Sequence, residues 1–529
     1  MPTRALRLPS LISGDRAPRA AAILIGLLAL LPILAVRYLP LHDYPFHLAR
    51  IIILARLDNP FFQRFYSHGS FLLPNIGMDA VAVPLSALVG PEPASRIFVG
   101  LTLLTPLFGT ICLHRAAHGR WSAWPLLAVL FLHNGIFRFG FLNYLFGMGL
   151  ALAAAGWWMV LRPGLGRFVI GLVAAILLLW CHFEAFAVFA VIVGGLEIGR
   201  AWIAWGKAGA GRALGDLLLA SLPFVVCLGL FALFSPTAAV TGAGFGYEPG
   251  HLTKLVGGLF SLSSGNRWLD GLSVLVILGI GGWLLMTRNL AVSTPLAFAT
   301  AAMVLAFFAV PSDIMGALYA DVRLAPPLAL LAIAALDIRR DAPAPIARAV
   351  LALAILLGVV RASVLTSQWR SYNAQIAPIA RAVGGIESGA TLFAATADPY
   401  PALIADTPDR RAVWQPPLKH VAAFAVLGSP VFVPMTWANP TQQPLAVRPA
   451  YQPVYDWQGN PKKVFTRTAL LALLGEINRH LTDGGWPALQ PAYLLVVGYR
   501  QLEPLHLPPF VAVAAQGDRF LLLRFTGQP

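Results

Sequence analysis

The sequence contains 529 residues, of which 58% are hydrophobic and only 12% are charged, and its formal net charge is +15. A soluble protein carries roughly a quarter charged residues, so this chain has more apolar surface than a water-soluble core can hide, and lipid must surround part of it. The positive charge does not indicate nucleic-acid binding, because Lys and Arg are scattered over short loops and form no basic face.

The N-terminal segment resembles a signal peptide only in part. Residues 1–20 are basic and precede the apolar run 21–36, but no clear small-residue cleavage site follows. We therefore expect an uncleaved first transmembrane helix, with residues 1–20 in the cytoplasm. The three cysteines lie in apolar stretches without a CxxC pair, and we expect small buried hydrophobic residues at Cys112, Cys181 and Cys227.

Eleven apolar segments recur along the chain, and most approach the roughly 17–25 residues that span a bilayer as a helix. The stretch 168–199 is too long for one span, so the polar break at 181–184 predicts a tight hairpin of two short spans. The predicted spans cover residues 21–36, 97–113, 121–136, 142–160, 168–182, 184–199, 214–234, 271–287, 293–310, 322–336 and 347–365.

The loops between these segments alternate in charge. One set is rich in Lys and Arg, and the opposite set holds most of the loop acids. The positive-inside rule places the basic set in the cytoplasm, and an odd number of spans then places the C-terminal end in the periplasm. We therefore expect a multi-pass protein of the bacterial inner membrane. The basic loops lie at 114–120, 161–167, 200–213, 288–292 and 337–346.

Three long segments share the predicted periplasmic side, namely 37–96, 235–270 and 367–529. In the last of these, proline becomes frequent and apolar runs shorten to strand length. The predicted class is a polytopic α-helical membrane protein, with a transmembrane domain over 21–366 and a soluble α/β periplasmic domain over 367–529. Strands are predicted at 390–395, 421–427, 493–497 and 520–525, an amphipathic helix at 469–481 with Leu470, Leu471, Leu474 and Ile477 on one face, and a joining amphipathic helix near 368–383.

The first long loop opens with the string HDYPFHLAR at 42–50, directly after a transmembrane helix. Pro45 favours an extended residue before it and a helix start after it. Asp43 would then sit at the mouth of the bundle, before a helix lying along the membrane surface on which His47 and Arg50 share a face. A substrate-binding or catalytic role for this string, including His42, competes with a polar cap tied to lipid headgroups.

Other polar residues on the predicted periplasmic side are further candidates. Asp79 reads either as a second active-site acid or as an ordinary helix-capping residue. Arg138 and Asn143 lie in the turn 133–144, where polar groups at membrane depth are functional candidates.

Two more pairs of polar residues lie at predicted span ends. His182 and Glu184 occupy the next outer turn, and a solvated turn is the alternative to a functional role. Asp321 and Arg323 lie at the outer end of the tenth span, where a local ion pair that anchors the helix end is the alternative.

These features resemble the GT-C fold glycosyltransferases, which take sugars from polyprenyl-phosphate carriers. The string HDYPFHLAR is similar to the start of uncharacterised bacterial membrane proteins grouped with that fold, as are RFGFLNYLFG at 138–147 and DVRLAP at 321–326. The resemblance covers roughly 20–366 and implies that Asp43 corresponds to the essential acid of the first outer loop. Many members carry a second acid in the second outer loop, but 137–143 has none here, so either Asp79 or Glu184 substitutes or the reaction needs one carboxylate.

The resemblance implies a membrane glycosyltransferase in which Asp43 is the general base and Arg323, with Arg138 or His47, binds the departing lipid phosphate. Its partners would be the bilayer, a polyprenyl-phosphate-linked sugar and a glycan, lipid or protein acceptor. Whether a divalent cation binds beside Asp43 stays open, since no strong ligand spacing in the sequence encodes such a site. The alternatives are a lipid or solute transporter and an envelope scaffold that recruits a partner through 367–529.

Overall fold

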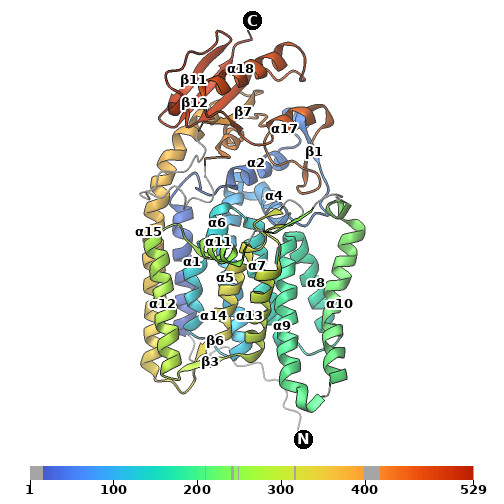
Figure 1. Cartoon of the computed structure of the whole chain (residues 1–529), viewed down its shortest axis with the longest axis vertical. Coiled ribbons are helices and arrows are strands. Elements are labelled where there is room, and N and C mark those ends of the chain that lie inside the picture. Colours follow the sequence, from blue (N-terminus) through green and yellow to red (C-terminus); the bar gives the residue numbers. More distant parts are fainter. Residues whose placement is uncertain are drawn as a thin grey trace.

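The computed structural model describes residues 16–208, 210–239, 244–247, 250–314, 317–397 and 418–527. Figure 1 shows a tall bundle of roughly parallel helices that carries a β-rich C-terminal region at one end. We call this the capped end of the bundle and the opposite one the far end.

Each of the eleven predicted spans coincides with helix. Those helices are α1 (Arg16–Leu34), α5 (Pro91–His118), η1 with α6 (Trp124–Phe131 and Gly135–Phe139), α7 (Leu142–Val160), α8 (Leu165–Cys181), α9 (Phe183–Ala208), α10 (Ala210–Phe234), α12 (Arg267–Met286), α13 (Thr294–Ala309), η3 with α14 (Val322–Leu324 and Ala325–Ala335) and α15 (Ala344–Gly384). Within the described residues, seven of the helices are long and apolar enough to cross a membrane, by length and composition.

The predicted break at 181–184 is confirmed. His182 is extended, with φ −166°, and separates α8 from α9. The prediction of two short spans is wrong for the second of them, because α9 continues for 26 residues to Ala208. Within α9, Glu197 pairs with Arg167 at 2.7 Å and so ties this helix to α8.

Loops that were predicted to share one side of the membrane do lie together. At the far end, β3 (Leu290–Val292) pairs antiparallel with β6 (Leu336–Ile338). Beside them, the Arg120 guanidinium donates to Asp337 at 2.8 Å, which joins the loop after α5 to the loop after α14. Loops that alternate in charge along the sequence therefore lie at alternate ends of the bundle (Figure 1).

The first long loop forms a layer on the capped end. It contains α2 (Tyr44–Ala55), α3 (Pro60–Phe65), β1 (Tyr66–His68) and α4 (Gly77–Val89). Pro45 occupies the first turn of α2, as its position predicts. Every residue of this helix from Tyr44 to Leu54 is buried, so α2 is covered by protein, and the expectation that it lies along the membrane surface stays a prediction.

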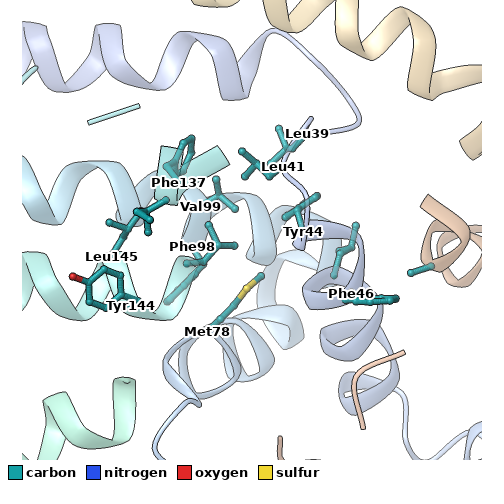
Figure 2. Packing of buried hydrophobic residues seen from close by; sticks show 14 of the residues in the cluster. Leu39, Leu41, Tyr44, Phe46, Met78, Phe98, Val99, Phe137, Tyr144 and Leu145 are labelled. Atoms are coloured by element: carbon teal, nitrogen blue, oxygen red, sulfur yellow. The ribbon is translucent and has the colours of Figure 1, made fainter. Parts of the chain in front are cut away.

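The burial of α2 has two sources. On one side lie apolar residues of the bundle, and Figure 2 shows Tyr44 and Phe46 in the same cluster as Met78, Phe98 and Val99. On the other side lies the C-terminal region, whose η5 (Val421–Phe424) and α16 (Ala425–Gly428) pack against α2. The apolar residues of α2 thus join two parts of the chain rather than facing lipid.

The C-terminal region is built on a five-stranded mixed sheet of order β11-β12-β10-β7-β9. Three predicted strands and the predicted helix are confirmed, although Leu471 is 40% exposed and Leu473 is buried in its place. The strand predicted at 421–427 is wrong, because that segment is η5 and α16. The elements are β7 (Thr391–Thr396), β9 (Lys462–Lys463), α18 (Arg467–Thr482), β10 (Ala492–Val497), η7 (Tyr499–Leu502), β11 (Val511–Gly517) and β12 (Phe520–Phe525).

Two features tie this region to the bundle. The last span and the predicted joining helix form one continuous helix, α15, of 41 residues. In addition, β8 (Leu445–Val447) pairs antiparallel with β1 of the first loop, Tyr66 facing Val447. The remaining elements are short: η2 (Pro236–Ala239), β2 (Phe245–Gly246), α11 (His251–Leu262), β4 (Asp313–Ile314), β5 (Ala317–Leu318), η6 (Pro449–Tyr451) and α17 (Gln452–Gln458).

Candidate active site

Asp43 is held by backbone pairing at the capped end of the bundle. The amides of His42 and Asp43 donate to the carbonyls of Arg138 and Phe139, each at 3.0 Å. The chain then turns at Gly140, whose φ is +91° and whose missing Cβ would lie 3.0 Å from the Asp43 Cβ and amide nitrogen. Glycine is therefore required at 140 by both conformation and space, and it lets the first and second loops meet at Asp43.

Two imidazoles face the same oxygen of Asp43. His420 Nδ1 lies 3.2 Å and His42 Nε2 lies 3.6 Å from Asp43 Oδ1. His420 Nδ1 also lies 3.2 Å from the His42 carbonyl, and its ring stacks on Phe46 with centroids 4.0 Å apart. All three polar residues are buried, with exposed fractions of 3% to 5%. The C-terminal region thus supplies a side chain to the predicted mouth of the bundle.

The electrostatics of this cluster favour a carboxylate that can exchange a proton near neutral pH. Burial raises the pKa of Asp43 to about 6, while the charges of His42, Lys419 and Arg323 oppose that rise. Burial lowers the pKa of His420 well below 6.5, and the nearby Lys419 charge lowers it further. A group with a pKa close to neutrality is suited to acid–base chemistry.

His47, Arg50 and Asp79 form a second buried chain of contacts. Arg50 binds Asp79 through two bonds, of 2.7 Å and 2.9 Å, and both side chains are fully buried. Arg50 also donates to His47 Nδ1 at 3.2 Å, so the proton of His47 lies on Nε2, which donates to the Gly140 carbonyl at 3.1 Å. These contacts end at Gly140, which lies next to Asp43, and the charge of Asp79 is matched by that of Arg50.

Asn143 connects the first loop to α7. Its amide nitrogen donates to the backbone and side-chain oxygens of Asn75 at 2.8 Å, and its side-chain oxygen accepts from the amide of Met78 at 2.6 Å. These bonds use the polar atoms of the side chain, so Asn143 fixes the start of α4. Its predicted role in substrate binding stays a prediction.

Asp321 and Arg323 each pair with another residue, whereas the alternative to a functional role was an ion pair between the two. Arg323 binds Glu184 at 3.0 Å and lies over the Phe141 ring, 3.9 Å from its centroid. Asp321 lies 3.6 Å from Lys254 Nζ and accepts from the amide of Val322 at 2.8 Å. Glu184 therefore serves as the counter-ion of Arg323, which itself contributes positive charge at Asp43.

His182 and Arg138 flank this arrangement. His182 Nδ1 accepts from the amide of Glu184 at 3.1 Å. The Arg138 side chain is half-buried and packs against Gly265 of the loop before α12. The guanidinium of Arg138 has no hydrogen bond or ion pair to the described residues, which leaves it available for an anionic ligand.

Sequence reasoning missed the contribution of the C-terminal region to this site. His420 contacts Asp43 directly, and Lys419 is half-buried and adds positive charge. Trp437 packs edge-on against His47, with ring centroids 5.3 Å apart. No local pattern around 419–420 distinguishes these residues, and the only available signal was a Lys-His pair inside an otherwise apolar stretch.

The donor set around Asp43 also suits a metal ion. One ligand atom from each of His42, Asp43 and His420 can be chosen so that all three lie within 4.8 Å of one another. Two imidazole nitrogens and one carboxylate oxygen match the ligands that zinc takes in proteins, whereas magnesium and calcium prefer oxygen alone. The residues therefore fit a borderline-soft divalent cation.

Comparison with known proteins bears on the fold. No family model and no curated protein sequence matches the chain. The chain is similar to the crystal structure of ArnT from Cupriavidus metallidurans bound to undecaprenyl phosphate, with a TM-score of 0.53 and 14% sequence identity, covering 96% of this chain and 98% of that chain. The chain has the fold of ArnT. This confirms the predicted class, a mostly helical multi-pass membrane protein with a C-terminal β-sheet region.

Proposed function

We propose that this protein is a membrane glycosyltransferase that transfers a sugar from a polyprenyl-phosphate donor to an acceptor at the periplasmic face of the inner membrane. The observation that carries the proposal is the buried Asp43 carboxylate, which lies where the first and second loops meet at the capped end of a fold shared with ArnT. The bound undecaprenyl phosphate of ArnT supports a lipid phosphate as the carrier. The charge pattern of the loops supports the periplasmic orientation.

In the proposed reaction, an acceptor hydroxyl oxygen attacks the anomeric carbon, and the bond from that carbon to the phosphate oxygen breaks. The hydroxyl proton passes to Asp43, and polyprenyl phosphate leaves with its negative charge. An ionised carboxylate within hydrogen-bond reach of the hydroxyl is what a general base requires. Attack from the face opposite the phosphate inverts the configuration of the sugar.

Positive charge is needed where the phosphate departs. Arg138 is the best-placed guanidinium, because the described residues leave it unpaired. Lys419 and Arg323 add charge close to Asp43, although Arg323 is already bound to Glu184. His47 is a weaker candidate for phosphate binding than the sequence predicted, because both its ring nitrogens are engaged within the protein.

The test is Asp43→Asn in the full chain. Asn keeps the size of the side chain but cannot accept the proton, so turnover should fall roughly 10²–10⁴-fold while expression and folding stay intact. The assay is transfer of labelled sugar in membranes supplied with a panel of polyprenyl-phosphate hexoses and pentoses. Asp58→Asn is the matched control, since it changes an exposed acid of the same loop. Wild-type transfer by Asp43→Asn would contradict the proposal and favour a transporter or scaffold.

A further inference from the structure

A groove that is apolar on one wall and polar on the other lies between α1 and α15, which run side by side in the bundle (Figure 1). Its volume is about 490 Å³, a size typical of small-ligand sites. Leu31, Leu34 and Ala35 form the wall on the side of α1, and Leu31 is 43% and Leu34 is 69% exposed. The groove lies where the predicted spans 21–36 and 347–365 end, so it opens at the boundary between the hydrocarbon and headgroup layers.

The opposite wall, on α15, presents hydroxyls that the protein does not use. Ser363, Thr366 and Ser367 line the groove, and their hydroxyls have no hydrogen-bond partner within the described residues. By contrast, Thr102 and Thr105 of α5 donate to the carbonyls four residues earlier, at 2.9 Å and 3.0 Å. Three unpaired hydroxyls on one wall suit a ligand that is rich in acceptor oxygens.

Positive charge lies at the end of the same groove. Arg370 lines it, is exposed, and has no hydrogen bond or ion pair to the described residues. Arg37 is exposed as well, and the amide of the next residue, Tyr38, donates to Asn373 Oδ1 of α15 at 2.9 Å. This bond holds Arg37 beside the turn that follows Arg370. The residues that line the groove include no acid, and guanidinium groups match the geometry of a phosphate.

We propose that this groove binds one anionic glycerophospholipid of the leaflet at the capped end. Its acyl chains lie along the exposed leucines of α1, its ester and phosphate oxygens accept from the hydroxyls of α15, and its phosphate pairs with Arg370 and Arg37. A zwitterionic headgroup suits the groove less well, because no lining acid matches its ammonium group. A polyprenyl phosphate has no ester oxygens for the hydroxyls. The bound lipid joins α1 to the helix that carries the C-terminal region.

The experiment uses the full chain, purified in detergent and stripped of lipid. Mixed micelles of detergent with phosphatidylglycerol should raise the thermal unfolding temperature as the lipid concentration rises, because the lipid binds the folded state. Phosphatidylcholine with the same acyl chains should raise it much less. Native mass spectrometry should find one phosphatidylglycerol that is retained on the chain in preference to phosphatidylcholine.

Two variants place the lipid in this groove. Arg370→Gln keeps a hydrogen-bonding side chain but removes the charge, so the phosphatidylglycerol concentration for half-maximal stabilisation should rise roughly fivefold. Ser363→Phe fills the groove from an exposed position and should abolish the stabilisation while both guanidinium groups remain. Arg348→Gln is the matched control, because it removes one charge from an exposed position at the far end of the same helix and should behave as the wild type.

Three results would overturn the inference. One is equal stabilisation of the wild type by phosphatidylglycerol and phosphatidylcholine. Another is undiminished phosphatidylglycerol binding in both Arg370→Gln and Ser363→Phe, which would place the lipid elsewhere. The third is displacement of the retained lipid by undecaprenyl phosphate, which would make the groove a site for the polyprenyl carrier. The inference does not depend on the proposed transfer reaction, since Asp43→Asn should bind phosphatidylglycerol as the wild type does.

Discussion

Asp43 and Asp79 are buried carboxylates of the same loop in contrasting surroundings. Asp79 receives two bonds from Arg50, so its charge is matched within the protein. Asp43 faces two histidines and the more distant charges of Lys419 and Arg323, and burial raises its pKa. The structure therefore favours Asp43 for chemistry and Asp79 for holding α4 against α2, although the predicted catalytic role of Asp79 stays a prediction.

Asp79→Asn tests that distinction at the residue scale. It leaves the buried Arg50 charge unmatched, so we expect unfolding to become easier by about 3–5 kcal/mol, with transfer per folded molecule close to wild type. Thermal unfolding in detergent and sugar transfer normalised to folded protein provide the measurements. Removing both charges in Arg50→Met/Asp79→Leu should recover much of the stability. A stably folded but inactive Asp79→Asn would instead identify Asp79 as the second acid.

At the scale of elements, charge and apolar length were good predictors of the spans. The eleven apolar runs became helices, and the break at His182 appeared where polar residues interrupt a long run. The predictions that failed concern elements whose apolar residues face protein. The segment 421–427 has the composition of a strand but folds as η5 and α16, because it packs on α2 rather than in a sheet.

Cysteine labelling tests the predicted orientation of these elements. Single cysteines at the exposed positions His68, in β1, and Ala450, in η6, probe the capped end, and those at Arg162, between α7 and α8, and Arg340, after β6, probe the far end. In intact spheroplasts with the native cysteines replaced by alanine, an impermeant thiol reagent should label the first pair and should reach the second pair only after lysis. The opposite pattern would invert the orientation and place the candidate site in the cytoplasm.

At the scale of the whole molecule, the predicted boundary at 367 cuts through a continuous helix. The five-stranded sheet lies within 391–525, so this region has its own core. Residues 418–451, however, carry η5, α16 and β8, which pack on α2 or pair with β1 of the first loop. The sheet gives this region a core of its own, but its contacts with the first loop also make it part of the assembly at the capped end of the bundle.

A fragment comprising residues 367–529 tests how far this region is independent. We expect a soluble fragment with mixed α/β circular dichroism and one cooperative melt, because the sheet and α18 supply a complete core. Hydrogen exchange should protect the amides of β7, β10 and β12 and leave those of β8 unprotected, since its partner strand β1 is missing from the fragment. A fragment without a cooperative transition would show that the sheet itself depends on the bundle.

The sequence by itself determined the membrane class, the span positions, the break at His182 and the helix start at Pro45, and it singled out Asp43 as a candidate. These features depend on local composition and on residues close together in the chain. The tertiary structure decided what surrounds Asp43, because Gly140, Arg323 and His420 reach it from segments about 100, 280 and 380 residues away. Partners at such separations leave no local periodicity or spacing, so only the assembled chain shows which buried acid has an arginine beside it and which has two histidines.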